Sequence, residues 1–364
     1  MILMNDFQKE YKVLRLDINK AIESVLKSGW HILGPRVKRF EQEFASFIGA
    51  KYCVGVANGL EAIQIALMAC GIKANDEVLT VSNSAVATAL AITNIGATPV
   101  FVDVDKYHHM DVNSIEDKIT DKTTAILPVH LFGQVANMEA IIRIAKKYKL
   151  KVIEDACQAH GAELNGKKAG VFGSASAFSF YPTKNLGGYG DGGAIITNDR
   201  KVFEMARKLR NYGSDVRYIH TLKGINSRLD EIQAAILSLK LKKLNSFIKN
   251  RNKIANLYFE NLKDIDQITL PLVRKNSYHS FHLFVVMAKN RINLMEYLKE
   301  KGIQSLIHYP RPIHKQKCYA EFNKLNLPIT EDNSNVVLSL PIHPYLTKKE
   351  VLTVCRHIKN FYKK

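Results

Sequence analysis

The chain has 364 residues, of which 46% are hydrophobic and 24% are charged, a composition that is ordinary for a globular protein. This length is ample for a sizeable core and suggests about two domains. No apolar run approaches the ~20 residues that a membrane-spanning helix needs, so we expect no membrane partner. Charged residues interrupt the N-terminal stretch at once, so we expect no signal peptide.

The charge of the chain favours an anionic partner. Lys and Arg number 52 against 34 Asp and Glu, which gives a formal net charge of +18. Such a balance is typical either of a nucleic-acid-binding face or of a field that attracts phosphorylated small molecules. The lysines are scattered, cluster only at 240–243 and at the C-terminus, and accompany no groove-reading motif. We therefore predict a small anionic substrate and no nucleic acid.

The cysteines give no sign of a stabilising cross-link. The 5 Cys, at positions 53, 70, 157, 318 and 355, include no CxxC pair. This pattern indicates reduced thiols in a cytoplasm rather than a disulfide framework or a zinc site. We expect a cytoplasmic protein without a bound metal.

Strands and helices alternate through the first half of the chain. Apolar residues spaced as on one helical face predict helices, as at 18–26, 37–47 and 138–145. Short runs rich in Val, Ile and Leu predict strands at 52–57, 77–81, 99–104, 125–131, 151–155 and 175–180. This alternation predicts an α/β fold with a largely parallel sheet that is buried on both faces.

The second half is predicted to be a smaller α+β unit. Helical patterning runs from Leu229 to about Lys249 and resumes from Arg251 to Leu262. Further elements are expected at 282–287, 294–301, 338–341 and 348–359. We place the domain boundary near 248, so that 1–248 form a large ligand-binding domain and 249–364 a small C-terminal domain.

Polar residues collect where the predicted strands end. Asn58, Ser84, His130, Asp155 and Ser179 stand at or just beyond carboxyl ends of strands, the edge at which parallel sheets bind ligands. Asn58 is also a suitable helix N-cap, and the helix N-terminus that follows it is suited to a phosphate group.

One lysine follows the strand at 175–180 after a turn at Pro182. Lys184 is followed by a glycine-rich stretch, 187–193, where the backbone can approach a ligand closely. A lysine beyond one strand end and Asp155 beyond another form the pair that pyridoxal phosphate needs. The amine attaches the cofactor covalently, and the carboxylate keeps the pyridine nitrogen protonated.

Three blocks resemble a known family. VIEDACQAHGA, FSFYPTKNLGGYGDGGA and GINSRLDEIQAAIL are similar to the DegT/DnrJ/EryC1/StrS nucleotide-sugar aminotransferases, and the resemblance spans about Gly29 to Pro341. It implies an aspartate-aminotransferase-like fold of type I, with a seven-stranded sheet in the large domain. It also implies pyridoxal 5'-phosphate, passing through its pyridoxamine form, and a homodimer with shared active sites.

The resemblance assigns cofactor contacts. Lys184 carries the cofactor and, once released, acts as the base, while Asp155 holds the ring nitrogen. Further contacts are expected from Gln158 at the ring and from Gly59, Leu60, Ser179 and the partner subunit's Asn226 at the phosphate. Leu60 replaces a usual threonine, and Ala85 replaces the aromatic residue that usually stacks on the ring. Asn226 has a second interpretation as the N-cap of the following helix.

The resemblance also suggests substrate contacts, each with a structural alternative. Trp30 can pack rather than bind, His160 can be a hydrogen-bonded structural residue, and the loop at 308–316 can be a polar surface turn. The residues expected to contact the substrate are Trp30, His160, Tyr181, Arg228, Tyr309 and His314.

The expected activity is amination of a nucleotide-linked keto-sugar. Lys184 disfavours the related dehydratases, which carry histidine at this position. The stretches NGLEA, QAHGA and HYPxPxHKQ resemble members that aminate dTDP-3-keto-6-deoxyhexoses with glutamate as donor, serving O-antigen or other glycoconjugate synthesis. Amination at C-4 is the alternative. Two other classes of protein remain as alternatives. A nicotinamide-binding oxidoreductase is disfavoured because the glycines at 187–193 do not form a GxGxxG motif that opens a helix. The other is a regulatory protein without catalytic activity.

Overall fold

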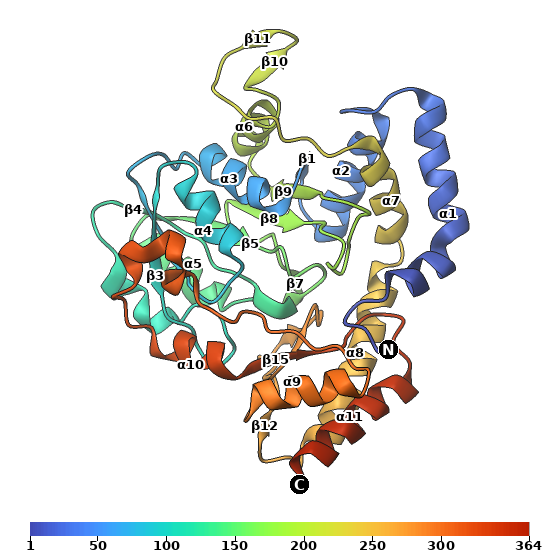
Figure 1. Ribbon diagram of the computed structural model, residues 1–364. Coiled ribbons are helices and arrows are strands. Elements are labelled where there is room, and N and C mark those ends of the chain that lie inside the picture. The colour runs from blue at the N-terminus through green and yellow to red at the C-terminus, as the bar shows by residue number, and fades with distance from the viewer. Residues whose placement is uncertain (364) are drawn as a thin grey trace.

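The computed structural model describes residues 1–363, and a seven-stranded sheet occupies its centre (Figure 1). The strand order is β1-β9-β8-β5-β4-β2-β3. The pairs between β3 and β8 are parallel, whereas β9 runs antiparallel to both β8 and β1. The prediction of a mostly parallel seven-stranded sheet is confirmed.

The elements up to the end of the large sheet are α1 (Phe7–Ser28), α2 (Pro35–Ile48), β1 (Tyr52–Val56), α3 (Gly59–Ala69), β2 (Glu77–Val81), α4 (Val86–Thr93), β3 (Thr98–Val102), β4 (Thr123–Ile126), α5 (Met138–Lys147), β5 (Lys151–Asp155), β6 (Glu163–Leu164), β7 (Lys167–Lys168), β8 (Ala175–Ser179) and β9 (Gly193–Thr197).

The later elements are α6 (Arg200–Leu209), β10 (Ser214–Val216), β11 (Ile219–His220), α7 (Glu231–Leu241), α8 (Leu244–Leu262), β12 (Ile268–Thr269), β13 (Ser277–Tyr278), β14 (Phe284–Ala288), α9 (Arg291–Glu300), α10 (Pro328–Val336), β15 (Val337–Leu340) and α11 (Lys348–Tyr362), with short 3₁₀ helices that include Leu131–Gly133, Ile313–Lys315 and Lys317–Phe322.

Helices cover both faces of the large sheet, which is why its central strands are apolar on both sides. One core cluster joins the sheet to α3, α4 and α6. The other joins it to α2, α5 and α7, and it contains the stripe of Val37, Phe40 and Phe44 expected from helical spacing. The result is a three-layer α/β arrangement.

A second, smaller core lies below the large sheet in Figure 1. It is built from the antiparallel strands β12, β14 and β15 with α8, α9 and α11 packed against them. Helix α8 passes residue 248 without a break: Leu244 and Ile248 pack in the large core, and Ile254 and Tyr258 pack in the small one. The division at 248 stays a prediction.

Some elements differ from their prediction. Helix α1 begins at Phe7 rather than 18, because Asp6 caps its first turn by accepting from Lys9 N at 2.9 Å. The helix expected from 229 to 249 is two helices, broken at Lys242–Lys243. Strand β9, whose first residues are glycine and alanine, was not predicted, because neither residue has a β preference.

Two segments leave the layered body. Residues 313–327 fold back onto the outer strand β3, where Ile313, Tyr319 and Leu327 pack with Phe101. The hairpin β10–β11 projects beyond α6 at the top of Figure 1 and exposes Tyr218. Within residues 1–363, none of the helices is both long and apolar enough to cross a membrane.

Candidate active site

The carboxyl ends of β1, β2, β5 and β8 open into one cavity of about 450 Å³. Parallel strands direct their carboxyl ends to the same edge, so residues far apart in sequence meet there. Ten of the lining residues were already singled out in the sequence as strand-end, cofactor-site or substrate positions: Asn58, Gly59, Leu60, Ser84, Ala85, Asp155, Gln158, Ser179, Tyr181 and Lys184. Val129 and Cys157 also line the cavity.

Lys184 reaches the cavity from a tight connection after β8. Lys184 N donates to Tyr181 O at 2.9 Å, and the next side chain, Asn185, anchors the turn by donating to Ser280 O at 2.9 Å. Burial lowers the pKa of the Lys184 amine below its ordinary value, while Cys157 and Asp155 act in the opposite direction. A lysine whose pKa is lowered is more readily available as a neutral base.

Asp155 is the last residue of β5 and is almost completely buried, with 4% of its surface exposed. Its Oδ2 accepts a hydrogen bond from Thr88 Oγ1 at 2.8 Å, and its Oδ1 accepts from Cys157 N at 3.2 Å. Thr88 Oγ1 also lies 2.8 Å from Ser84 Oγ. These bonds hold the carboxylate in one orientation at the floor of the cavity.

The first turn of α3 forms one end of the cavity. Asn58 is its N-cap and accepts from Glu61 N at 2.9 Å, which confirms the capping prediction. Within residues 1–363 the amides of Gly59 and Leu60 donate to no acceptor, as is usual for the start of a helix. A Cβ on Gly59 would lie 2.6 Å from Ser179 Cβ, so only glycine fits this close approach.

Gln158 links the cavity to the C-terminal part of the chain. Its Oε1 accepts from Phe132 N at 3.0 Å, and its Nε2 donates to Tyr309 Oη at 2.9 Å. Tyr309, which was expected to contact the substrate, therefore lies beside Gln158. Burial raises the pKa of Tyr309 to about 12, so its phenol is neutral.

Two predicted substrate residues are fully buried away from the cavity. His160 lies among Phe44, Phe178 and Phe180, with ring centroids 5.2 Å from Phe178, and it does not line the cavity. His314 lies between Ser82 and Glu331: its Nδ1 is 2.7 Å from Ser82 Oγ and its Nε2 is 3.1 Å from Glu331 Oε1. Neither histidine lines this cavity, which favours packing and positioning roles, and their contacts with the substrate stay predictions.

Three residues that were predicted to contact the cofactor or the substrate do not line this cavity of their own subunit. Trp30 is 57% exposed and donates through its indole to Ile32 O at 2.7 Å. Arg228 donates to Asn211 Oδ1 at 3.0 Å, and Asn226 is exposed. The alternative that Asn226 caps the next helix is wrong, since α7 begins at Glu231 with Asp230 as its N-cap. Their contacts with a cofactor or substrate stay predictions.

Sequence reasoning missed Thr88, which donates to Asp155, and the buried Glu154 beside it in the chain. Thr88 lies on α4, a helix that was not predicted. The sequence pattern therefore gave no sign that its side chain reaches Asp155 at the end of β5. Glu154, next to Asp155, is fully buried and accepts from His130 Nε2 at 2.9 Å and from Gly170 N at 2.8 Å. A charged residue inside an apolar strand, as in VIED, was the available signal for this network.

The cavity fits pyridoxal phosphate. The Lys184 amine, whose pKa is lowered, and the Asp155 carboxylate line the same cavity. At one end, the backbone amides of Gly59 and Leu60 offer an anion site, and the lack of a Cβ on Gly59 leaves room for it. Ala85 provides no ring to stack, and Ile63 and Val129 supply apolar wall instead. Among residues 1–363, His, Cys, Asp and Glu form no cluster of three that could hold a metal.

The fold and this site define a pyridoxal phosphate-dependent aminotransferase of fold type I. More narrowly, the chain belongs to the DegT/DnrJ/EryC1/StrS aminotransferase family, whose sequence model matches residues 13–359.

Relatives and solved structures agree with this membership. The chain is 51% identical over 95% of both lengths to a dTDP-3-amino-3,6-dideoxy-alpha-D-galactopyranose transaminase of Aneurinibacillus thermoaerophilus. It is 42% identical to a dTDP-3-amino-3,4,6-trideoxy-alpha-D-glucose transaminase of Streptomyces venezuelae, over 98% of this chain and 95% of the relative. Its structure superimposes on S. venezuelae DesV with a TM-score of 0.97 at 41% identity, covering 100% and 99% of the two chains. Against NtdA of Bacillus subtilis, solved with bound PMP, the TM-score is 0.90 at 32% identity, covering 96% and 82%.

Proposed function

We propose that this enzyme transfers an amino group to the C-3 keto group of a dTDP-linked 6-deoxyhexose, with L-glutamate as the donor. We further propose that it works as a cytoplasmic homodimer in which Asn226 of one subunit completes the phosphate site of the other. The exposure of Asn226 and its place outside its own cavity support this second proposal.

The observation that carries the proposed chemistry is the pairing of Lys184 and Asp155 in one cavity. When bound there, pyridoxal phosphate would supply an electron-accepting ring, and its aldehyde carbon would carry the nitrogen from the donor to the keto-sugar. Lys184 Nζ would hold the cofactor covalently, and once released it would act as the base that takes the proton from the donor's α-carbon and delivers it to the cofactor. Burial keeps this amine neutral more readily than an exposed lysine.

The other residues of the cavity hold groups in place. Asp155 would accept from the protonated ring nitrogen, and Thr88 keeps its carboxylate oriented. The amides of Gly59 and Leu60 would bind the phosphate at the start of α3. Tyr181 lines the cavity and is exposed, which supports the proposal that it contacts the sugar nucleotide.

Three relatives support the C-3 position. Besides the two dTDP-3-amino-sugar transaminases above, the chain is 40% identical to a UDP-2-acetamido-2-deoxy-3-oxo-D-glucuronate aminotransferase of Pseudomonas aeruginosa. The names of all three place the nitrogen or keto group at C-3. The two with higher identity carry dTDP, which is why we favour that nucleotide over UDP.

The test is product analysis. The purified enzyme is incubated with glutamate and either a dTDP-3-keto- or a dTDP-4-keto-6-deoxyhexose, and the amino sugar is detected by mass spectrometry and its nitrogen located by NMR. We expect nitrogen at C-3 from the 3-keto substrate only. Nitrogen at C-4, or turnover of the 4-keto sugar alone, would overturn the C-3 assignment.

A further inference from the structure

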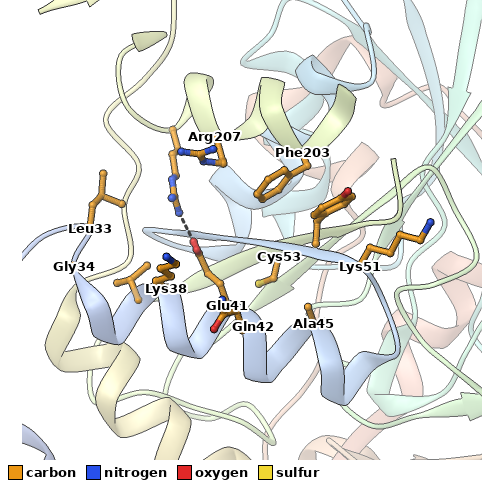
Figure 2. Close-up of a pocket in the computed structure, with 13 residues that line it drawn as sticks. Leu33, Gly34, Lys38, Glu41, Gln42, Ala45, Lys51, Cys53, Phe203 and Arg207 are labelled. Carbon is orange, nitrogen blue, oxygen red and sulfur yellow. Dashed lines mark hydrogen bonds and ion pairs between the residues drawn. The ribbon is translucent and has the colours of Figure 1, made fainter. Parts of the chain in front are cut away.

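A second and larger cavity, of about 530 Å³, lies on the outer side of the edge strand β1 between α2 and α6 (Figure 2). It shares no lining residue with the cavity that contains Lys184. The proposed reaction therefore makes no use of it. Its volume lies within the ~300–1,000 Å³ typical of small-molecule sites.

A buried guanidinium forms part of its lining. Arg210 has 8% of its surface exposed, and its Nη1 donates to Gly55 O at 2.8 Å and to Glu41 Oε1. Within residues 1–363, Nε and Nη2 of this side chain donate to no acceptor, and neither is sealed from solvent. Arg210 thus presents fixed donors to the cavity, with its position set by Glu41.

Three further cations surround the opening. Lys38 comes from α2, Lys51 precedes β1, and Arg207 lies on α6 (Figure 2). Lys38 and Lys51 form no ion pair with any carboxylate in the described chain, and Arg207 has only Glu204 at 3.4 Å. Glu41 is the one acidic residue in the lining and is already paired with Arg210. The cavity is therefore suited to a polyanion.

One wall is aromatic. Tyr52 and Phe203 stack with ring centroids 4.6 Å apart and an interplanar angle of 17°, and the Arg207 guanidinium lies 5.6 Å from the Phe203 centroid. Cys53, Ala45 and Val37 supply further apolar surface. Aromatic and apolar lining beside fixed cations suits a ligand with a flat ring at one end and phosphates at the other.

We infer that this cavity is a second ligand site that binds a nucleoside di- or triphosphate. The phosphates lie against Arg210 and the rim cation Lys38, the base packs on the wall formed by Tyr52 and Phe203, and Lys51 adds positive charge at the other end of the cavity (Figure 2). Packing on an aromatic wall does not read the edges of the base, so the site accepts adenine as well as thymine.

The experiment is isothermal titration calorimetry of the cofactor-loaded enzyme with ADP and, separately, with inorganic pyrophosphate. The test variant is Lys38→Ala/Lys51→Ala, which removes two exposed charges without disturbing the core. The matched control is Lys118→Ala/Lys122→Ala, which removes the same charge from exposed positions elsewhere. We expect ADP to bind the parent and the control alike, and to bind the test variant at least about tenfold more weakly, since each charge-assisted contact contributes to affinity.

A second variant tests the aromatic wall. Phe203→Leu is expected to weaken ADP binding several-fold and to leave pyrophosphate binding unchanged. Equal ADP affinity in the test and control variants would place the nucleotide elsewhere, as in the Lys184 cavity, and would overturn the inference. Pyrophosphate binding as tight as ADP binding, or no saturable ADP binding in the parent, would overturn it as well. None of these outcomes depends on whether the enzyme aminates C-3.

Discussion

At the residue scale, the orientation of Asp155 depends on neighbouring groups that line the same cavity. Thr88 donates to Oδ2, Ser84 lies within hydrogen-bonding distance of Thr88, and the Cys157 amide donates to Oδ1. A buried carboxylate whose two oxygens both accept hydrogen bonds is held in one rotamer. This carboxylate lines the cavity, where it would accept from the ring nitrogen of a bound cofactor.

Lys184→Ala removes the amine on which the proposed reaction depends. In the parent enzyme, borohydride should abolish the visible absorption band of the bound cofactor, and we expect this borohydride-sensitive band to be missing in the variant. We also expect the rate of amine transfer to fall by several orders of magnitude. Absorption scans before and after borohydride, together with a coupled glutamate assay, measure both. Retained turnover in this variant would refute the role assigned to Lys184.

Thr88→Val removes the hydroxyl that donates to Asp155 while keeping the shape of the side chain. A buried hydrogen bond to a carboxylate contributes ~1.5 kcal/mol, so we expect kcat to fall roughly tenfold. The pH range over which the cofactor's visible spectrum changes should also shift relative to that of the parent enzyme. A purely structural role of Thr88 would not produce this shift.

The matched control for this variant is Thr80→Val. Thr80 is equally buried, but its Oγ1 donates to Leu127 O at 2.9 Å, away from the cavity. We expect this variant to lose a similar amount of stability in urea and to keep the spectrum and kcat of the parent. Equal kinetic effects of both variants would remove the special role of Thr88.

At the scale of elements, the start of α3 is where helix geometry becomes a binding site. The N-cap Asn58 uses its side chain on Glu61 N, which leaves the amides of Gly59 and Leu60 for an anion. The partial positive charge of a helix N-terminus favours the same ligand. The Leu60 side chain differs from the usual threonine, but the backbone donors do not depend on it.

Gly59→Ala tests this turn. The added Cβ would lie 2.6 Å from Ser179 Cβ and 3.1 Å from Cys157 Sγ, so the turn must shift. We expect pyridoxal phosphate affinity to fall at least about tenfold, measured by titrating the visible band into enzyme stripped of cofactor. Leu60→Ala is the control, since it keeps both amides, and its affinity should stay within about twofold. The reverse order of the two variants would contradict a backbone-based phosphate site.

At the scale of the whole molecule, buried histidines couple stability to pH. Burial lowers the pKa of His160 and of His279 to about 3 and that of His108 to about 4. Each binds its proton more weakly in the folded than in the unfolded chain, where the pKa is about 6.5. Their neutral forms therefore favour folding fully above pH 6.5, and this contribution is lost as pH falls from 6.5 towards 3–4.

We therefore expect the urea midpoint to be constant between pH 8 and 7 and to fall progressively below pH 6.5. His160→Leu, which replaces the ring inside the Phe44–Phe178–Phe180 cluster, should flatten this dependence and keep amine transfer. His220→Leu, at an exposed position, should leave the pH profile unchanged. If His160→Leu folds normally but loses activity, the result would support the substrate contact that the sequence predicted for His160.

The proposed shared sites make a prediction about mixed subunits. Lys184→Ala and Asn226→Ala proteins, each inactive alone, are unfolded together and refolded as a mixture. Random pairing yields half heterodimers, each with one intact site, so activity should recover to about a quarter of the parent. No recovery, with heterodimers verified by mass spectrometry, would show that Asn226 serves its own subunit.

Local patterns were sufficient to predict much of this protein. The parallel sheet follows from Val/Ile/Leu strands separated by helices, and strand-end placement predicted that Asp155, Ser179 and Lys184 would meet at one edge. Periodicity and strand ends are properties of neighbouring residues in the chain, so they can be read without the fold. The resemblance of three sequence blocks to known aminotransferases then predicted the chemistry.

Only the tertiary structure decided which side chains reach the cavity. His160 and His314 occupy motif positions yet are enclosed by other elements, while Thr88 contacts Asp155 from a helix that no pattern predicted. The cavity behind β1 likewise joins residues 38, 51, 207 and 210. Burial and long-range hydrogen bonds depend on how distant segments pack, and packing is a property of the whole chain that no local pattern contains.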